Sequence, residues 1–547
     1  MIEYWISPSN ERVFQTDAPA RASNLTVQVP RGGRCSFQVH ARLASTPAPS
    51  WIDAKAATRS NLELRVRRIG YVAVPHRNTG TPPWEIDHYA DIPGFVPDPL
   101  FPQTGQLAAP DLNYGYWITV VVPTSARPGL RTVTVELFAD GSRKPFGTLN
   151  ARIDVSAVAL APRRDFPVTH WFYTDALCDW YGVDPFVEAF WPVCDRYLRN
   201  YAEHGSDTIY VPALTPSLDG EKRPTQLLRI TPAGDGGYRF DWKLVKRFVD
   251  LARSCGIRRF EWPHLFTQWG AERAILVYRD RGGSAEPLWP RATPATSPTY
   301  RRFLEAYLPA LKRFLDREGM LDCSYFHVSD EPHQDHLENY RKARSMLKEL
   351  APWMKVMDAL SNIEFARDDL TDVPVPSIAT AIEFKEAGIP SWAYFCCSPR
   401  GEYTNRLLDT PLPKIRAIGW LLYRHRFLGF LHWGFNYWYK SQTRELIDPY
   451  LVSDGLAWPN WAHGDTFVVY PGPDGPIDSI RWEVFAESLQ DYTLLQTLGV
   501  DPDDSALAPL QDFRVFPRDP AWIPCVRRKI LERRDRSRAP QVDRDSA

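Results

Sequence analysis

The sequence predicts an α/β protein in which a (β/α)8 TIM barrel follows an N-terminal antiparallel β-sandwich domain. Two observations carry this prediction. Up to about residue 160, short segments such as "CSFQVHARL" and "RTVTVELFAD" alternate apolar and polar residues and are separated by Pro or Gly. From residue 166 onward, short apolar segments alternate with helical patterns, which is typical of a parallel sheet with covering helices.

The chain therefore divides into three predicted parts. Residues 1–160 form the β-sandwich domain, and the linker "ALAPRRDFP" leads to a barrel over residues 166–500. Residues 501–547 form a C-terminal extension, with an Asp/Pro-rich stretch before a terminal helix that frays into a basic tail. A chain of 547 residues, 44% of them hydrophobic, can bury a core in each of two domains.

Eight short apolar segments supply the predicted barrel strands. In order they are "PVTHWFY", "DTIYVPA", "IRRFEW", "CSYFHVS", "MKVMDALS", "VPSIAT", "WAYFCC" and "LGFLHWGF". The first three helices that follow end at Gly205, Gly256 and Gly319, because glycine adopts the left-handed conformation that closes a helix. Eight strand and helix units in about 330 residues match a (β/α)8 barrel.

Composition excludes several classes of partner and cofactor. Lys plus Arg number 65 and Asp plus Glu number 66, so a formal charge of -1 argues against nucleic acid and anionic membranes as partners. The start "MIEYWISPSNERVF" lacks the features of a signal peptide, so we expect a cytoplasmic protein. The eight cysteines include no CxxC pair, and we expect neither a zinc site nor another cofactor.

Barrel enzymes place their chemistry where strands end and the following loops begin, which converts the strand order into a list of site residues. The candidate substrate-binding residues are His264, Gln268, Trp269, Asp358, Tyr394, Trp433, Asn436 and Tyr439. They are aromatic, amide, imidazole and carboxylate side chains without a Lys or Arg cluster. Such a set suits a neutral ligand rich in hydroxyl groups, and aromatic rings can stack on sugar faces.

The stretch "HVSDEPHQDH", residues 327 to 336, follows the fourth strand and has three interpretations. As a helix start, Ser329 or Asp330 would be the N-cap and Pro332 the first helical residue. A metal site would need its ligands on one side of a single site. His327, however, lies on the strand, whereas His333 and His336 lie on the predicted helix. As an acid/base site it places Asp330 and Glu331 at the mouth of the barrel.

Two adjacent carboxylates differ from the usual glycosidase pair, which lies on either side of the scissile bond and comes from different strands. Neighbouring residues in extended chain point to opposite sides. Asp330 and Glu331 could nevertheless divide the work, with Glu331 protonating the glycosidic oxygen and Asp330 holding a nucleophile that the substrate carries. The 2-acetamido group of an N-acetylhexosamine is such a nucleophile.

At this point the sequence resembles a known family. The motifs "YFHVSDEP", "HLFTQWGA", "GFLHWGFNYWY" and "GDTFVVYPGPDGPIDSIRWEVFAESLQDY" are similar to those of glycoside hydrolase family 123. The resemblance implies a β-sandwich and TIM barrel, and a retaining β-N-acetylgalactosaminidase that works through an oxazolinium intermediate. It implies that Asp330 orients and stabilises the acetamido group, and that Glu331 is the general acid and then the general base. An oligosaccharide or glycoside is the expected substrate.

Two other functions stay open on the sequence. A conventional retaining glycosidase would use Glu331 as acid/base with a separate carboxylate nucleophile, for example Glu402 in "SPRGEYTN", and would act on sugars with a plain 2-hydroxyl. A catalytically silent carbohydrate-binding barrel would bind glycans without turnover, because a fold does not guarantee a function.

Overall fold

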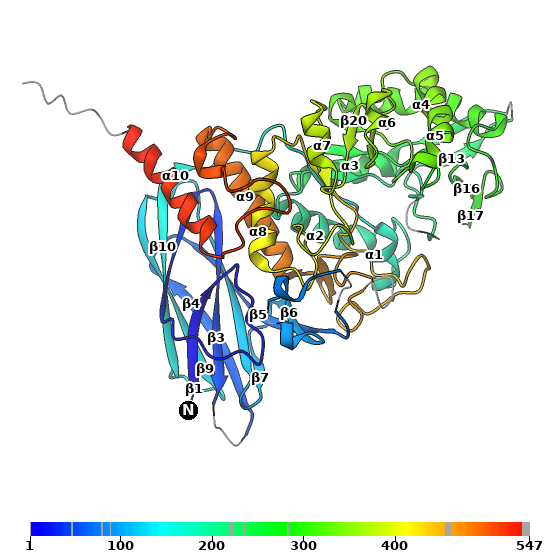
Figure 1. Cartoon of the computed structure of the whole chain (residues 1–547). Coiled ribbons are helices and arrows are strands. Elements are labelled where there is room, and N and C mark those ends of the chain that lie inside the picture. Colours follow the sequence, from blue (N-terminus) through cyan, green and yellow to red (C-terminus); the bar gives the residue numbers. More distant parts are fainter. Residues whose placement is uncertain are drawn as a thin grey trace, which may run out of the picture. The chain divides into compact units, whose positions relative to one another are not determined.

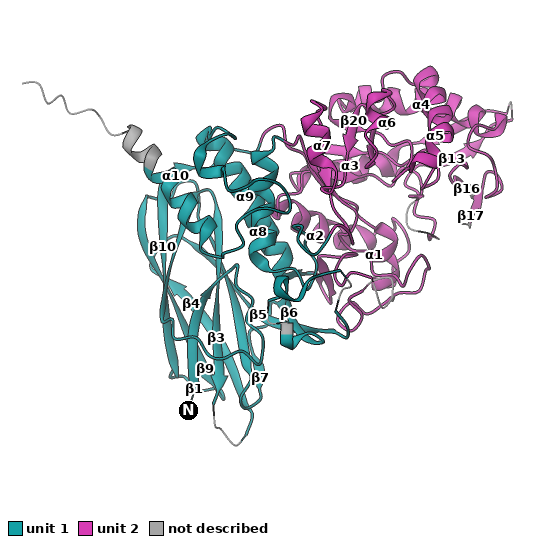
Figure 2. Ribbon diagram, viewed as in Figure 1, with its two compact units in different colours: residues 1–163, 400–426, 477–547 teal, residues 164–399, 427–476 magenta. Residues whose placement is uncertain are grey.

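The structure, a computed structural model, divides into two compact units (Figure 2). It describes residues 2–44, 48–77, 80–87, 89–217, 220, 222–234, 236–281, 284–454 and 461–538. The first unit comprises residues 1–163, 400–426 and 477–547, and the second comprises residues 164–399 and 427–476. No helix in the described part of the chain is both long enough and apolar enough to cross a membrane.

Two β-sheets form the N-terminal part of the first unit (Figure 1). The first sheet contains, in spatial order, β1 (Ile2–Pro8), β3 (Arg34–Leu43), β8 (Asn113–Val121), β5 (Glu63–Val74), β6 (Gly94–Phe101) and β24 (Gly475–Ser479). The second contains β2 (Asn24–Arg31), β10 (Gly147–Ala159), β9 (Gly129–Ala139), β4 (Ser50–Thr58) and β7 (Gln106–Ala108). Apolar side chains of both sheets, such as Val39 and Val135, belong to one buried cluster.

One pair of strands departs from the predicted antiparallel arrangement. Strand β2 runs parallel to β10, with Val27 opposite Ile153. Parallel pairing needs a long crossover, and more than a hundred residues separate these two strands along the chain. All other described pairings among these strands are antiparallel.

The first unit also contains three helices from later in the chain (Figure 1). They are α8 (Leu412–Arg424), α9 (Ile480–Leu498) and α10 (Trp522–Arg538). The predicted boundaries placed residues 400–426 and 477–500 in the barrel domain and the last 47 residues in a separate extension. The contacts in the structure instead group all of these residues with the N-terminal sheets. Buried ion pairs explain the difference, because Glu483 of α9 binds Arg67 of β5 at 2.9 Å and Asp491 binds Arg416 of α8 at 2.8 Å. Sequence periodicity gives no sign of such long-range pairs.

The second unit contains a curled sheet of six parallel strands. In spatial order they are β18 (Ser324–Tyr325), β15 (Arg259–Glu261), β12 (Thr208–Tyr210), β11 (Val168–His170), β22 (Phe430–His432) and β21 (Ala393–Tyr394). A further parallel pair joins β19 (Met357–Ala359) and β20 (Val373–Val375). Single parallel bridges link Phe326 to Val356 and Ser377 to Tyr394. Seven of the eight segments predicted as strands thus contain one short strand each. The sixth, "VPSIAT", was placed too late, because it begins at Val375, the last residue of β20.

Helices and two hairpins connect these strands. The helices are α1 (Thr174–Tyr181), α2 (Phe190–Glu203), α3 (Lys243–Ser254), α4 (Pro298–Arg317), α5 (Leu337–Leu350), α6 (Glu364–Arg367) and α7 (Ala381–Glu386). The hairpins are β13 (Arg229–Pro232) with β14 (Tyr238–Asp241), and β16 (Tyr278–Arg281) with β17 (Ser284–Pro287). Strand β23 (Val469–Gly472) precedes β24. Because the six-stranded sheet is parallel, the loops after its strands emerge at one edge and can build a common site.

Candidate active site

A cavity of about 130 Å³ lies in the second unit at the carboxyl ends of its strands. Its lining consists of Trp171, Gln268, Trp269, Asp330, Glu331, Ala359, Tyr394, Cys396, Cys397, Leu431, Trp433, Gln442 and Trp461. Asp330 and Glu331 are the carboxylates among the described residues of this lining. The site therefore combines two acids with a predominantly aromatic wall, as expected for a small concave ligand site.

Asp330 and Glu331 do not cap a helix, contrary to the simplest interpretation of their sequence context. The next helical turn begins at Gln334, and α5 begins at Leu337. Glu331 has a φ of 43°, in the left-handed region that non-glycine residues seldom adopt. The turn at Glu331 interrupts the alternation of extended chain, so both neighbouring carboxylates face one cavity. Strained backbone of this kind is found preferentially at functional sites.

The two carboxylates have different partners. Gln268 Nε2 donates a hydrogen bond to Asp330 Oδ2 at 2.8 Å, and the backbone N–H of Trp269 donates to the Asp330 carbonyl oxygen at 2.9 Å. Tyr394 donates its hydroxyl to Glu331 Oε1 at 2.6 Å, and the Glu331 N–H donates to the Ala359 carbonyl at 3.0 Å. Asp330 thus binds an amide and Glu331 a phenol, which gives two chemically distinct acids side by side.

Aromatic side chains form much of the cavity wall. Trp433 is oriented by a hydrogen bond of 3.0 Å from its Nε1 to Asp465 Oδ2. Trp171 is buried and donates from Nε1 to Glu261 Oε2 at 3.2 Å, so its ring is also held by a carboxylate. Trp269 is 42% exposed. The exposed indole ring of Trp269 can stack on a ligand, whereas the rings of Trp433 and Trp171 are each held by a hydrogen bond to a carboxylate.

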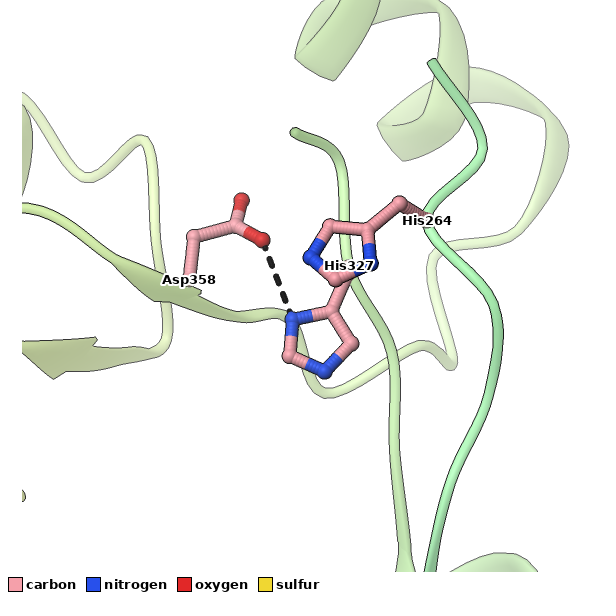
Figure 3. A group of neighbouring side chains, drawn as sticks. All are labelled: His264, His327 and Asp358. Carbon is pink, nitrogen blue, oxygen red and sulfur yellow. Dashed lines mark hydrogen bonds and ion pairs between the residues drawn. The ribbon is translucent and has the colours of Figure 1, made fainter. Parts of the chain in front are cut away.

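A second group of titratable residues in this unit is fully buried. Figure 3 shows three of them, His264, His327 and Asp358. His327 Nδ1 is 3.3 Å from Asp358 Oδ1, and His327 Nε2 is 3.2 Å from Glu261 Oε2. His264 stacks on His327 with ring centroids 4.1 Å apart. Tyr340 donates its hydroxyl to Asp358. His327 thus lies between two carboxylates, two residues after the end of β18 and three residues before Asp330.

The two histidines differ in charge. Burial lowers the pKa of His327, but the hydrogen bonds and charges of Asp358 and Glu261 outweigh this effect and raise its pKa to about 9. Burial lowers the pKa of His264 well below its usual value, and the neighbouring His327 adds to that effect. At neutral pH the pair is therefore an imidazolium stacked on a neutral imidazole.

His264, His327 and Asp358 offer ligand atoms within 4.8 Å of one another, which is close enough to consider a metal ion. A carboxylate accepts from each ring nitrogen of His327, so both nitrogens act as donors and neither has a lone pair for a metal. A metal would also have to displace the imidazolium from Glu261. The group is better described as a buried ion pair that holds two strand ends together.

This ion pair leads to a prediction about stability and pH. The folded pKa of His327, about 9, lies above the reference value of 6.5, so its contribution is fully present below pH 6.5 and is lost as pH rises through 9. A difference of this size corresponds to about 3 kcal/mol. We expect the unfolding free energy of the wild type to fall by about that amount relative to His327→Gln between pH 7 and 10. Denaturant unfolding at a series of pH values measures it, and parallel profiles would contradict the ionised state of His327.

The structure brings four of the predicted binding residues to the cavity. Gln268, Trp269, Tyr394 and Trp433 line it. Asn436 does not, because its side chain is buried and exchanges hydrogen bonds of 2.9 and 3.0 Å with the backbone of Tyr173. The remaining three residues also bind protein groups instead of facing the cavity. His264 and Asp358 belong to the buried ion-pair layer, and Tyr439 donates to Asp179 at 2.7 Å.

Sequence reasoning missed several residues of the lining. Trp171 follows the first strand, and Cys396 and Cys397 follow the seventh, so the strand-end rule could have found all three. Gln442 and Trp461 come from irregular chain after the eighth strand, where no sequence pattern marks them. Glu402, the alternative nucleophile, lies in the first unit and binds Arg514 at 3.0 Å. It is absent from the described lining of this cavity.

Comparison with known proteins gives one family match for this chain. The family described as "Glycoside hydrolase 123, catalytic domain" matches residues 171–498. A family 123 glycoside hydrolase from Clostridium perfringens, described for glycolipid glycan hydrolysis, superposes with a TM-score of 0.73 at 14% identity and covers 98% of both chains.

Two further solved structures are less similar. A Bacteroides ovatus family 5 xyloglucanase has a TM-score of 0.31 at 10% identity, and covers 86% of this chain and 98% of its own. A Rhizomucor miehei family 5 mannosidase has a TM-score of 0.31 at 12% identity, and covers 66% of this chain and 97% of its own. A search of curated proteins found no match. Since the family match spans more than half of the sequence and includes both cavity carboxylates, the chain belongs to glycoside hydrolase family 123.

Proposed function

We propose that this glycosidase is a retaining β-N-acetylgalactosaminidase that uses the 2-acetamido group of its substrate as the nucleophile. The observation that carries the proposal is the pair of adjacent carboxylates, Asp330 and Glu331, in one small cavity. A conventional retaining glycosidase needs a second carboxylate about 5 Å across the scissile bond from the acid. Adjacent residues with separate partners suit a division of labour in which the substrate supplies the nucleophile.

In the proposed mechanism Glu331 protonates the glycosidic oxygen as the bond from C1 to that oxygen breaks. The acetamido carbonyl oxygen attacks C1 from the opposite face and forms an oxazolinium ring. Glu331, now ionised, removes a proton from water, and the water attacks C1 and opens the ring with net retention. Tyr394, which donates to Glu331 Oε1, keeps the carboxyl oriented toward the leaving group through both steps.

Asp330 has a different role in this proposal. It accepts the N–H of the acetamido group, which aligns the carbonyl oxygen with C1, and its negative charge balances the positive oxazolinium. Gln268 holds the Asp330 carboxylate at 2.8 Å, and the left-handed turn at Glu331 places it beside the acid. Charge stabilisation by a preorganised group is usually the largest contribution to catalysis.

We also infer the finer architecture of the two units. In the second unit, the bridges Phe326 to Val356 and Ser377 to Tyr394 connect the two-stranded pair to both ends of the six-stranded sheet, which supports a closed (β/α)8 barrel. In the first unit, the single core shared by both sheets supports a β-sandwich. In a barrel of this kind the cavity lies at the catalytic face.

Hydrolysis of two matched substrates tests the proposed function. We expect turnover of 4-nitrophenyl N-acetyl-β-galactosaminide, and turnover of 4-nitrophenyl β-galactoside lower by at least about 10³-fold, because only the former carries the nucleophile. NMR of the first product formed should show the β-anomer. Faster hydrolysis of the plain galactoside would point to a protein nucleophile, and saturable binding of both sugars without hydrolysis would indicate a carbohydrate-binding protein.

A further inference from the structure

A second cavity, of about 510 Å³, lies within the first unit and is larger than the catalytic one. Strand β2, the start of β3, helix α9 and the first turns of α10 contribute to its wall. One part of the wall is apolar, with Leu25, Val27 and Ile523. Another part of the wall is polar and consists of charged side chains that are themselves buried, among them Arg527 and Glu487.

Arg527 is the unusual member of this lining. Its side chain is 8% exposed, and its Nη1 is 3.4 Å from Asp491 Oδ1. Its Nε and Nη2 atoms are buried and have no hydrogen-bond partner among the described residues. Burial lowers the pKa of Arg527 despite the charge of Asp491. Leaving a buried donor unpaired destabilises the folded state, and more so when the donor is charged.

Arg416, in the same cluster, has a guanidinium that is paired with carboxylates. Arg416 donates from Nε to Asp491 Oδ2 at 2.8 Å and also binds Glu487 through Nη1. Its pKa is raised, since the carboxylates of Asp491 and Glu487 outweigh the effect of burial. Arg416 therefore pairs with both Glu487 and Asp491, whereas Arg527 has one long contact, to Asp491, among the described residues.

The two guanidinium nitrogens of Arg527 without a partner among the described residues, Nε and Nη2, indicate which chemical group could bind there. Nε and Nη2 carry two parallel N–H bonds, a geometry that matches the two oxygens of a carboxylate. Glu487 Oε1 also lines the cavity and has no hydrogen-bond partner among the described residues. Its repulsion of a doubly charged phosphate ester is about twice its repulsion of a singly charged carboxylate, so the carboxylate is favoured. The apolar wall at Leu25, Val27 and Ile523 would cover a hydrocarbon chain.

We propose that this cavity of the non-catalytic unit binds a small monocarboxylate with an apolar chain, whose carboxylate pairs with the Nε and Nη2 edge of Arg527. The ligand lies against Leu25 and Ile523 and excludes water from the buried charges. This site is distinct in sequence and location from the catalytic cavity and does not depend on the proposed sugar specificity.

Isothermal titration calorimetry with three probes tests the chemistry. Octanoate has the proposed carboxylate and chain, octanamide has the same shape without the charge, and inorganic phosphate has charge without the chain. We expect saturable binding of octanoate, with octanamide and phosphate each weaker by at least about tenfold. Equal affinity for octanamide, tighter binding of phosphate, or no saturable octanoate binding would overturn the proposal, the last outcome indicating a cavity filled only by solvent.

Variants of the full chain locate the site. Arg527→Gln should weaken octanoate binding by at least about tenfold, whereas Lys529→Gln, which removes an equal charge from an exposed position on the same helix, should leave it within about twofold. If Arg527→Gln does not fold, Leu25→Trp provides a second test, because it fills the apolar end from an edge strand and should abolish binding. Unchanged octanoate binding by a folded Arg527→Gln or Leu25→Trp variant would overturn the assignment. Hydrolysis of the aryl glycoside should be unaffected by all three substitutions.

Discussion

Replacing Glu331 by glutamine should lower kcat by about 10²- to 10⁴-fold on a substrate with an unactivated leaving group, such as a methyl or disaccharide glycoside. Glutamine keeps the oxygen that accepts the Tyr394 hydroxyl, so the fold and the cavity should persist. It cannot donate a proton to the glycosidic oxygen. The loss should be much smaller on a 2,4-dinitrophenyl glycoside, whose leaving group departs without protonation. Steady-state kinetics on the two substrates measures the difference.

Glu338→Gln is the matched control for that variant. Glu338 lies on α5 a few residues later, is exposed, and forms a surface pair with Lys342 at 3.4 Å. Such pairs contribute little to stability, so activity should remain within about twofold of the wild type. Equal losses for both leaving groups in Glu331→Gln would show that Glu331 does not act as the proton donor.

Replacing Asp330 by asparagine should have the second largest effect, a loss on the order of 10²- to 10³-fold on the N-acetylgalactosaminide. The substitution is almost isosteric, but it removes the charge that would balance the oxazolinium. It also allows an NH2 group to face the NH2 of Gln268, which now donates to Asp330 Oδ2. The acetamido oxygen would be poorly aligned in consequence. Kinetics on the N-acetylgalactosaminide, with thermal unfolding to confirm the fold, measures the effect.

Asp335→Asn serves as its control, because Asp335 is an exposed residue in the turn that precedes α5. It should leave both activity and stability close to those of the wild type. A useful diagnostic is added azide. If Asp330 were a covalent nucleophile, azide would restore activity to Asp330→Asn with an inverted glycosyl azide as product, whereas a residue that only aligns the acetamido group gives no such product.

The left-handed backbone at Glu331 connects these two predictions. Its N–H is bound by the Ala359 carbonyl of β19 at 3.0 Å, and the preceding Asp330 carbonyl accepts from Trp269. Strand β19 and the loop that carries Trp269 thus hold the dipeptide in a conformation that its own sequence disfavours. The same constraint explains why both side chains face one cavity although neighbours in extended chain do not.

The local sequence pattern was sufficient to predict the order and approximate positions of the strands in the second unit. The period of apolar residues and the helix-ending glycines located eight strand segments, and the rule that sites lie at strand ends brought Gln268, Tyr394 and Trp433 into the list together with the carboxylates. Strand positions and loop positions could be predicted because they depend on residues close in sequence.

Residues that failed to reach the cavity show the limit of that reasoning. Asn436 and Asp358 also follow or end strands, yet each is taken up by distant protein groups, the backbone of Tyr173 in one case and His327 in the other. The conformation of Glu331, which moved the start of the next helix to Gln334, depends on a contact with another strand. Sequence periodicity contains no information on such partners.

By itself, then, the sequence determined the order of the elements, the position of Asp330 and Glu331 at a strand end, and the family to which the chain belongs. Tertiary structure alone decided that the two carboxylates share a cavity, that His264 and Asp358 form a buried ion-pair layer with His327, and that α8 and α9 pack with the N-terminal sheets. The physical reason is that element formation is governed by neighbours along the chain, whereas burial, charge state and side-chain direction are governed by contacts between residues far apart in it.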